Sequence, residues 1–314
     1  MTCHNCRIEC RRFGKHRNGL QRYRCQQCRK TFTEPHERPL DNMTLPFEKA
    51  EQILALLVEG CSVRSVERLT GVHRDTILRL LVLAAEKCEK FMGRLIANVP
   101  VRDVQADEIW GFIQKKEAHK RPEEAKDETI GDAYCFVALE RHTKLVLNFA
   151  LGRRNQATTD IFIEGLRAAT SPREFQITTD GFGPYRAAIG STLSDRVDFA
   201  QLIKVYQANP EGEHRYSPAE VVATEVVPVL GRPDPDRICT SHVERQNLTM
   251  RMQIRRLTRL TNGFSRKWEN LWAALCLHFA YYNFCRVHNS LRVTPAMEAG
   301  VANRVWSIRE LLAV

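Results

Sequence analysis

Apolar side chains recur at the three- and four-residue intervals of amphipathic helices between residues 47 and 81. A first helix is predicted from Phe47 to a stop at Gly60, and Ser62 suits the N-cap of a second helix. Thr70-Gly71-Val72 predicts a tight turn into a third helix, which carries Ile77, Leu80 and Leu81. Three short helices joined in this way outline a helix-turn-helix module.

From about Val101 onward, the patterns predict strands as well as helices. Three strands in succession are expected at Val104–Ile113, Ala133–Leu139 and Lys144–Ala150. A helix, a strand, a short helix and a strand follow, at Thr158–Ala169, Phe175–Thr179, Pro184–Ile189 and Arg196–Ile203. This succession, closed by another helix, is the order of the ribonuclease-H-like fold. We therefore predict an α/β catalytic core of that class.

The last third of the chain completes the predicted organisation. Tyr206–Ile238 is proline-rich and irregular apart from Val221–Val229, and we interpret it as an insertion. Long apolar stripes predict helices from Ser241 to Leu260 and from Trp268 to Phe284. The expected domains are a zinc ribbon at 1–40, a helix-turn-helix DNA-binding domain at 45–92 and a catalytic domain at 100–300, with the insertion at about 206–238.

Charge and cysteine usage narrow the class of protein. The chain has 314 residues and carries 47 Lys and Arg against 37 Asp and Glu, a formal charge of +10 that favours a polyanionic partner. No apolar stretch reaches the length of a membrane span, and the basic N-terminal segment lacks the apolar core of a secretory signal. Eleven Cys in such a chain indicate a reducing compartment, so we expect a cytoplasmic protein without membrane contact.

Four of the cysteines form two knuckles in the N-terminal segment. Cys3 and Cys6, and then Cys25 and Cys28, are separated by two residues within each pair, which is the spacing of a four-Cys zinc site. A module with almost no aliphatic side chains needs such an ion to fold. His4 and Cys10 have poorer spacing, and we interpret them as bystanders. A structural Zn²⁺ ion is therefore predicted.

Three carboxylates fall where the predicted core would place a catalytic centre. Asp107 lies within the first strand, Asp180 ends the strand after the first core helix, and Glu244 opens the long helix. Phosphoryl transfer with Mg²⁺ or Mn²⁺ needs hard oxygen ligands of this kind, and water or a DNA 3′-hydroxyl then serves as the nucleophile. The alternative is that all three are ordinary solvated acids, Asp180 being a turn residue before Gly181.

The neighbours of these acids rank the candidates. Asp107 is flanked by apolar residues in a strand, where an unpaired charge is costly, whereas Glu108 should point to the opposite face and is the weaker candidate. Glu220 and Glu225 compete with Glu244 for the third place. Helix phase favours Glu244, since it puts two cations on its face that suit a DNA-phosphate track: Arg251 and Arg255.

The third helix of the helix-turn-helix module has polar residues at the end that would enter a major groove. They are Arg74, Thr76 and Arg79. A three-helix unit is also common as a plain structural bundle, and this alternative remains open.

Several motifs in order along the chain resemble the insertion-sequence transposases of the first-described bacterial family. They are Arg22-Tyr23-Arg24-Cys25 with Lys30-Thr31-Phe32, Thr179-Asp180-Gly181-Phe182, Val243-Glu244-Arg245-Gln246-Asn247-Leu248-Thr249-Met250-Arg251, and Tyr282-Asn283-Phe284-Cys285-Arg286-Val287-His288 with Thr294-Pro295-Ala296. The interval between Asp180 and Glu244 is longer than is common in related integrases, and Tyr206–Ile238 fills it.

The resemblance implies an Asp-Asp-Glu triad with Mg²⁺, acting on the inverted-repeat ends of a mobile element and on target DNA. Because two ends must be brought together, a homo-oligomer assembled on double-stranded DNA at the bacterial nucleoid is expected. Two other classes of protein are the alternatives. A DNA-binding regulator or domesticated transposase with a silent core would lack triad acids, and a Tyr or Ser recombinase would use a different fold.

Overall fold

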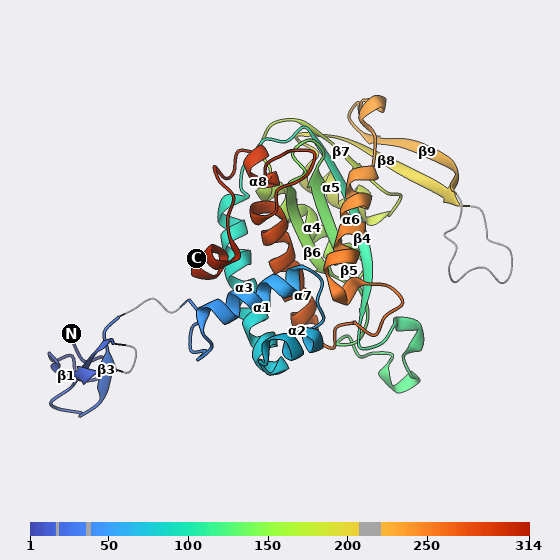
Figure 1. Cartoon of the computed structure of the whole chain (residues 1–314). Helices are drawn as coiled ribbons and strands as arrows, with labels where there is room; N and C mark the ends of the chain where they lie inside the picture. Colours follow the sequence, from blue (N-terminus) through green and yellow to red (C-terminus); the bar gives the residue numbers. More distant parts are fainter. Residues whose placement is uncertain (17–18, 36–38, 207–220) are drawn as a thin grey trace. The chain divides into compact units, whose positions relative to one another are not determined.

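The computed structural model describes residues 1–16, 19–35, 39–206 and 221–314 of the chain (Figure 1). It divides into two compact units, Met1–Thr44 and Leu45–Val314. In the described part of the chain, no helix is long and apolar enough to cross a membrane.

The first unit is a small antiparallel sheet of three strands, β1 (Arg11–Lys15), β2 (Gln21–Arg24) and β3 (Thr31–Thr33), in the order β1-β2-β3. Its interior is made of cysteines and two aromatic rings rather than aliphatic side chains: Cys3, Cys10 and Cys25 are buried, and Cys6, Cys28, Tyr23 and Phe32 pack against them. This composition supports the predicted ribbon, because so small an apolar interior cannot offset the entropy of folding by itself.

The second unit begins with the three predicted helices, α1 (Phe47–Val58), α2 (Val63–Thr70) and α3 (Arg74–Leu95). The Ser62 hydroxyl accepts the N–H of Ser65 at 3.0 Å, which confirms the predicted N-cap. Gly71 ends α2 in the left-handed region with φ 70°, a conformation that favours glycine. The tight turn inferred from the sequence is therefore present.

Helix α3 extends well beyond the helix-turn-helix outline and packs against the C-terminal part of the unit. Its second half contacts α7 (Trp268–Ala280) and α9 (Ile308–Ala313). Phe91 meets the rings of Phe284 and Trp306 at centroid distances of 4.8 and 4.5 Å. The three helices thus share a hydrophobic core with the rest of the second unit, while the N-terminal end of α3 stays exposed.

A mixed six-stranded sheet forms the centre of this unit. The strands are β4 (Asp103–Ile113), β5 (Gly131–Glu140), β6 (Val146–Gly152), β7 (Phe175–Thr179), β8 (Val197–Tyr206) and β9 (Val221–Leu230), in the order β6-β5-β4-β7-β8-β9. β4, β7 and β8 run parallel, whereas β5, β6 and β9 are antiparallel to their neighbours. The predicted succession of strands and helices is confirmed, with β9 added inside the segment interpreted as an insertion.

Helices cover both faces of the sheet (Figure 1). Helices α4 (Gln156–Ala169) and α5 (Pro184–Thr192) lie on one face, where Phe136 of β5 contacts Phe162 and Tyr185. Helices α6 (Ser241–Gln253) and α7 lie on the other, where Phe149 of β6 stacks with Phe279 at 4.7 Å. The ends of β4 and β7 are therefore enclosed between two helical layers.

One predicted helix ends earlier than expected. Helix α6 stops at Gln253, and a short 3-10 turn, η4 (Arg255–Leu257), follows an extended Ile254. The helix predicted at Trp268–Phe284 is present, as α7 to Ala280 and then as a π-helical turn, η5 (Tyr281–Cys285). Two further short elements are η3 (Pro235–Arg237) and α8 (Pro295–Glu298). Apolar periodicity continues past Gln253, so it could not reveal where α6 ends.

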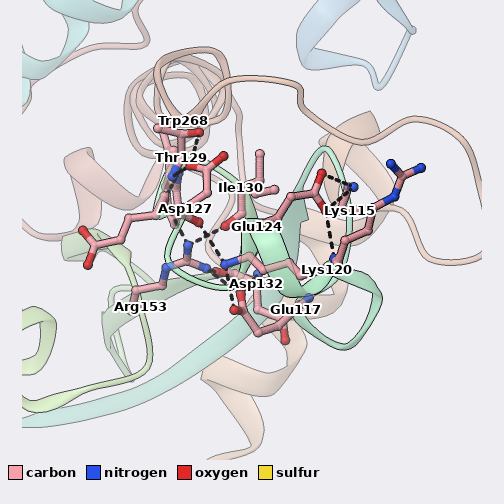
Figure 2. A network of polar contacts seen from close by, with 12 residues as sticks. Lys115, Glu117, Lys120, Glu124, Asp127, Thr129, Ile130, Asp132, Arg153 and Trp268 are labelled. Atoms are coloured by element: carbon pink, nitrogen blue, oxygen red, sulfur yellow. Dashed lines mark hydrogen bonds and ion pairs between the residues drawn. The ribbon is translucent and has the colours of Figure 1, made fainter.

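The connection between β4 and β5 is a polar loop with two 3-10 turns, η1 (Glu117–His119) and η2 (Pro122–Glu124). Figure 2 shows the contacts between this loop and Arg153, which follows the end of β6. The guanidinium donates to the carbonyls of Ile130 at 2.6 Å and Glu128 at 3.0 Å, and it lies 5.1 Å from the ring of Trp268. The loop is consequently tied to both β6 and α7.

Candidate catalytic centre and zinc module

Asp107 lies on β4 just beyond Ala106, the last residue of β4 that pairs with β7. Its Oδ1 accepts the N–H of Glu108 at 2.9 Å, and its Oδ2 accepts the side-chain amide of Asn247 in α6 at 2.8 Å. Burial, and then the nearby charge of Asp180, raise the pKa of Asp107 to about 6. Asp107 is therefore a largely buried acid with neighbours that disfavour its charge.

The structure corrects the prediction that Glu108 is a weaker candidate than Asp107 for the catalytic centre. Its backbone pairs with Phe136, on the α4 and α5 face, so the predicted alternation with Asp107 is correct. Yet the ligand atoms of Asp107, Glu108 and Asp180 all lie within 4.8 Å of one another. Because β7 ends at Thr179, Asp180 stands past the sheet and is reached from both faces. Alternation on the strand does not exclude Glu108 from the site.

The Glu108 side chain is only 3% exposed, and its Oε1 makes no hydrogen bond of good geometry, although the buried hydroxyl of Tyr185 lies close enough to oppose the rise of its pKa. Its Oε2 lies 3.4 Å from the guanidinium of Arg154. Burial, and then the charge of Asp180, raise the pKa of Glu108 to about 8. A buried carboxylate with an unpaired oxygen costs folding free energy unless a cation or donor comes to it.

Asp180 combines a turn with a second, open function. Its Oδ1 accepts the N–H of Phe182 at 3.0 Å, which is the turn contact that the solvated-acid alternative expects, but its Oδ2 faces Arg154 at 3.4 Å. Gly181 is not in the left-handed region; a Cβ there would come within 3.1 Å of the Ile203 side chain. The glycine therefore gives room rather than a special turn.

Glu244 lies in the first turn of α6, and β4 fixes the start of that helix. The side-chain oxygen of Gln105 accepts the N–H groups of His242 at 3.0 Å and Val243 at 3.1 Å. The Thr240 hydroxyl donates to Glu244 Oε1 at 2.6 Å. Through this cap the same strand that carries Asp107 also places Glu244.

The competing acids have different positions. Glu225 is exposed on β9, and Glu220 lies outside the described residues.

One cavity of about 520 Å³ is lined by Asp107, Asp180 and Glu244. Two cations line it as well. Arg154 stacks over the ring of Phe182 at 4.0 Å and contacts both Asp180 and Glu108, while Lys204 of β8 contacts Glu244. The structure therefore brings the three predicted acids to one cavity, with Glu108 beside them. Whether they act as ligands stays a prediction.

Asp103, at the other end of β4, shows what a structural acid looks like in this fold. It is only 4% exposed, and burial by itself would raise its pKa. Arg237 at 2.7 Å and His142 at 2.8 Å donate to it, and the net result is a lowered pKa. Among the described residues Asp107 has no cation partner, and Arg154 approaches Glu108 only to 3.4 Å. Neither acid therefore forms a close buried ion pair like that of Asp103.

The chemistry of these donors fits a divalent metal ion. All are hard carboxylate oxygens, as Mg²⁺ and Mn²⁺ prefer, and one of them is buried and unpartnered. Asp107, Glu108 and Asp180 form a group that could hold an ion, and Glu244 borders the same cavity. The raised pKa values point the same way, because a bound cation relieves the cost of burying these charges.

The four predicted zinc ligands also come together. The Sγ atoms of Cys3, Cys6, Cys25 and Cys28 lie within 4.8 Å of one another, and Cys3 and Cys28 are 3.6 Å apart. A tetrahedral ion with Zn–S bonds of about 2.3 Å would set its sulfurs about 3.8 Å apart. The N–H of Cys28 donates to Cys25 at 3.5 Å and helps to lower the pKa of that thiol, whereas burial and the neighbouring thiols raise the pKa of Cys6. Thiols packed this closely favour one thiolate and oppose further ones unless a metal ion is bound.

Both knuckles have the same local form. The residue after each second cysteine, Arg7 and Arg29, adopts a positive φ of 54° and 59°, and its N–H returns to the carbonyl of the first cysteine. Cys10 is buried nearby but does not join the group, in line with its interpretation as a bystander.

The predicted DNA-contacting side chains occupy two places. Arg74 and Arg79 are exposed at the N-terminal end of α3, and Thr76 is half-buried there. Arg251 is on α6 as expected and donates to the carbonyl of Leu257 at 3.0 Å. The common helical face predicted for Arg255 is wrong, because α6 ends at Gln253 and Arg255 lies in η4. Contacts of these residues with DNA stay a prediction.

Three residues near the acids were missed in the sequence. Asn247 was detectable in principle, since it lies three positions after Glu244 and so faces the same way on the helix. Arg154 follows the end of β6, but an Arg in a loop has no sequence pattern that would identify it as part of a site. Lys204 lies within β8, and only the tertiary pairing with Glu244 identifies it.

Comparisons with known proteins add little to this description. No protein-family model matches the chain, and no curated protein matches it. Among solved structures, it is similar to an endonuclease V from Streptomyces avermitilis over 61% of this chain and 90% of that chain, with 14% identity and a TM-score of 0.21. A likeness this distant gives no information about activity, so the functional interpretation depends on the sheet and its carboxylates.

Proposed function

We propose that the chain is a metal-dependent DNA transposase of the Asp-Asp-Glu type, which cuts DNA at the ends of an insertion sequence and joins them to target DNA. The observation that carries the proposal is the meeting of Asp107, Glu108 and Asp180 within 4.8 Å, beside Glu244 in one cavity. The succession of strands and helices around them is that of ribonuclease-H-like nucleases.

The acidic and the basic residues of the cavity would have different roles in phosphoryl transfer. Mg²⁺ or Mn²⁺ ions, when bound, would activate the attacking oxygen and stabilise the leaving one. Asp107, Asp180 and Glu244 would hold them, with Glu108 as an additional ligand. Arg154 and Lys204 border the cavity and can donate to phosphate oxygens. No protein nucleophile is needed.

Binding of the DNA ends is assigned to the other modules. The zinc ribbon and the end of α3 that carries Arg74, Thr76 and Arg79 would contact the inverted repeats, in keeping with the chain's formal charge of +10. The transposase-like motifs support the choice of a mobile-element end as substrate. Joining two ends requires more than one copy of the chain on the DNA.

A DNA-binding regulator with a silent catalytic core is the second candidate. It would use the zinc ribbon and helix-turn-helix but would have no need of several carboxylates around one cavity. The meeting of Asp107, Glu108 and Asp180 within 4.8 Å argues for the enzyme, because like charges this close destabilise the fold unless a cation is bound.

The test is a cleavage and strand-transfer assay on end-bearing DNA with Mg²⁺. Asp107→Asn, Asp180→Asn and Glu244→Gln should each lower the rate at least about a hundredfold. Glu164→Gln, which removes an exposed charge on α4, should leave it unchanged. Full activity in one of the three variants removes that residue from the centre, and no metal-dependent cleavage by the parent refutes the proposal.

A further inference from the structure

A second cavity, of about 410 Å³, lies beside β4 a short way past the carboxylates. Trp110, Gly111 and Phe112 form one side, and the segment 257–262, which follows α6, forms another. Four cations line this cavity and no carboxylate does; they are Lys116, Arg251, Arg256 and Arg259. The function proposed above makes no use of this concentration of positive charge.

None of these four cations has a carboxylate partner among the residues that the structure describes. Arg251 donates only to backbone carbonyls, those of Leu257 and Trp110, and Lys116 lies over the Trp110 ring at 5.4 Å. Arg256 makes no hydrogen bond or ion pair within the described ranges. Burial lowers the pKa of Arg256 to about 10, so it remains charged at neutral pH. Arg251 and Arg256 are half-buried, whereas Lys116 and Arg259 are exposed at the mouth. Half-buried guanidinium groups without a carboxylate partner favour an anionic ligand.

Two aromatic residues, Trp110 and Phe112, line the β4 side of the cavity. Their rings lie 5.7 Å apart and are tilted by 37°, and Phe264, outside the lining, lies 5.1 Å from Phe112. At Gly111, a Cβ would come within 2.9 Å of the Leu257 side chain, so the two walls approach as closely as a glycine allows. Aromatic rings beside guanidinium groups without carboxylate partners match the two halves of a nucleotide, its base and its phosphate.

The position of the cavity relates it to the candidate catalytic centre. Trp110 follows Asp107 by three positions on β4, about 10 Å along the strand, and by alternation its side chain leaves the strand on the face of Glu108. At about 3.4 Å of rise per nucleotide, that distance corresponds to about three nucleotides. We propose that the cavity binds one unpaired nucleotide of the DNA strand near the cleaved phosphate, with its base against Trp110 and its phosphate against Arg256. This inference rests on the proposed function.

The test compares two probes on the full-length protein: a fluorescein-labelled octamer of thymidine and an octamer of the same length without bases. The parent should bind the thymidine octamer about tenfold more tightly, since stacking on an aromatic ring favours the base. Trp110→Ala should bring this ratio close to one, whereas Trp110→Phe, which retains a ring, should keep most of it.

The cations are tested through the salt dependence of binding. Arg256→Gln should weaken both octamers and lower the slope of log Kd against log salt by about 0.7, the contribution of one phosphate contact on a single strand. Arg173→Gln removes an exposed cation before β7, at the opposite end of that strand from Asp180, and should change neither quantity.

The outcomes separate this inference from the proposed function. Equal binding of the two octamers by the parent overturns the base-binding cavity, and so does an unchanged base preference in a folded Trp110→Ala. Asp107→Asn should lose cleavage but keep the base preference. If cleavage depends on the acids while the octamers bind alike, the inference fails and the proposed function stands. If the parent prefers bases but cleaves no DNA, the proposed function fails instead.

Discussion

Replacing Glu108 by Gln tests the candidate metal centre through the stability of the protein. Glu108 is 3% exposed, and its pKa is raised from 4.5 to about 8. Between these values Glu108 binds more protons in the folded state than in the unfolded state, so its contribution to the stability of the parent falls as pH rises through that window. At 1.36 kcal/mol per unit, the penalty above pH 8 is about 2 to 5 kcal/mol, and Gln does not carry it.

Guanidinium unfolding followed by tryptophan fluorescence, without added divalent metal, measures the difference at pH 5 and pH 8.5. Glu108→Gln should be more stable than the parent by about 1 kcal/mol at pH 5 and by about 2 to 5 kcal/mol at pH 8.5. Mg²⁺ or Mn²⁺ should then stabilise the parent more than the variant, because the ion neutralises the buried charge.

The control is Glu164→Gln, which removes an exposed acid on α4 and should stay within about 0.5 kcal/mol of the parent at both pH values. Equal pH dependence of parent and Glu108→Gln would show that Glu108 carries no buried charge at neutral pH. It would also remove Glu108 from the proposed ligand set.

Two other predictions address parts of the chain away from the acids. Cys25→Ser should lose one zinc ion per chain in elemental analysis, because four thiolates share the ion, and an unchanged zinc content would contradict the four-Cys site. His278 is buried with both ring nitrogens unpartnered, and burial lowers its pKa to about 3. The unfolded state therefore binds the His278 proton below pH 6.5, and this residue contributes a loss of stability of about 1.4 kcal/mol per unit as pH falls from there toward 4, opposite in sign to the contribution of Glu108. The difference in unfolding free energy between His278→Leu and the parent should therefore grow in favour of the variant from pH 7 to pH 5; a difference that does not change with pH would refute it.

Local patterns in the sequence determined the elements and the four cysteines that could bind a zinc ion. Helical periodicity placed α1 to α3, because an amphipathic helix repeats its apolar face every three to four residues whatever it packs against. The two Cys-x2-Cys pairs identified their own site, since a knuckle is a turn of a few residues. The order of strands and helices likewise followed from the chain, and with it the places of Asp107 and Asp180.

The sequence alone could not show where a helix ends or which side chains of different elements meet. The stripe of α6 runs through Ile254 and Leu257, yet the helix ends at Gln253, and Leu257 is buried from a separate turn. An apolar residue at position 257 is expected whether the backbone there is a continued helix or a separate turn. Arg255 was misplaced for that reason.

Tertiary structure decided which side chains meet at the candidate catalytic centre. Strand alternation correctly put Glu108 on the face opposite Asp107, but the short β7 leaves Asp180 past the sheet, where both acids reach it. Arg154 and Lys204 join from a loop and from β8. Periodicity describes which way a side chain leaves its own strand, whereas the distance between carboxylates depends on where the neighbouring strand ends.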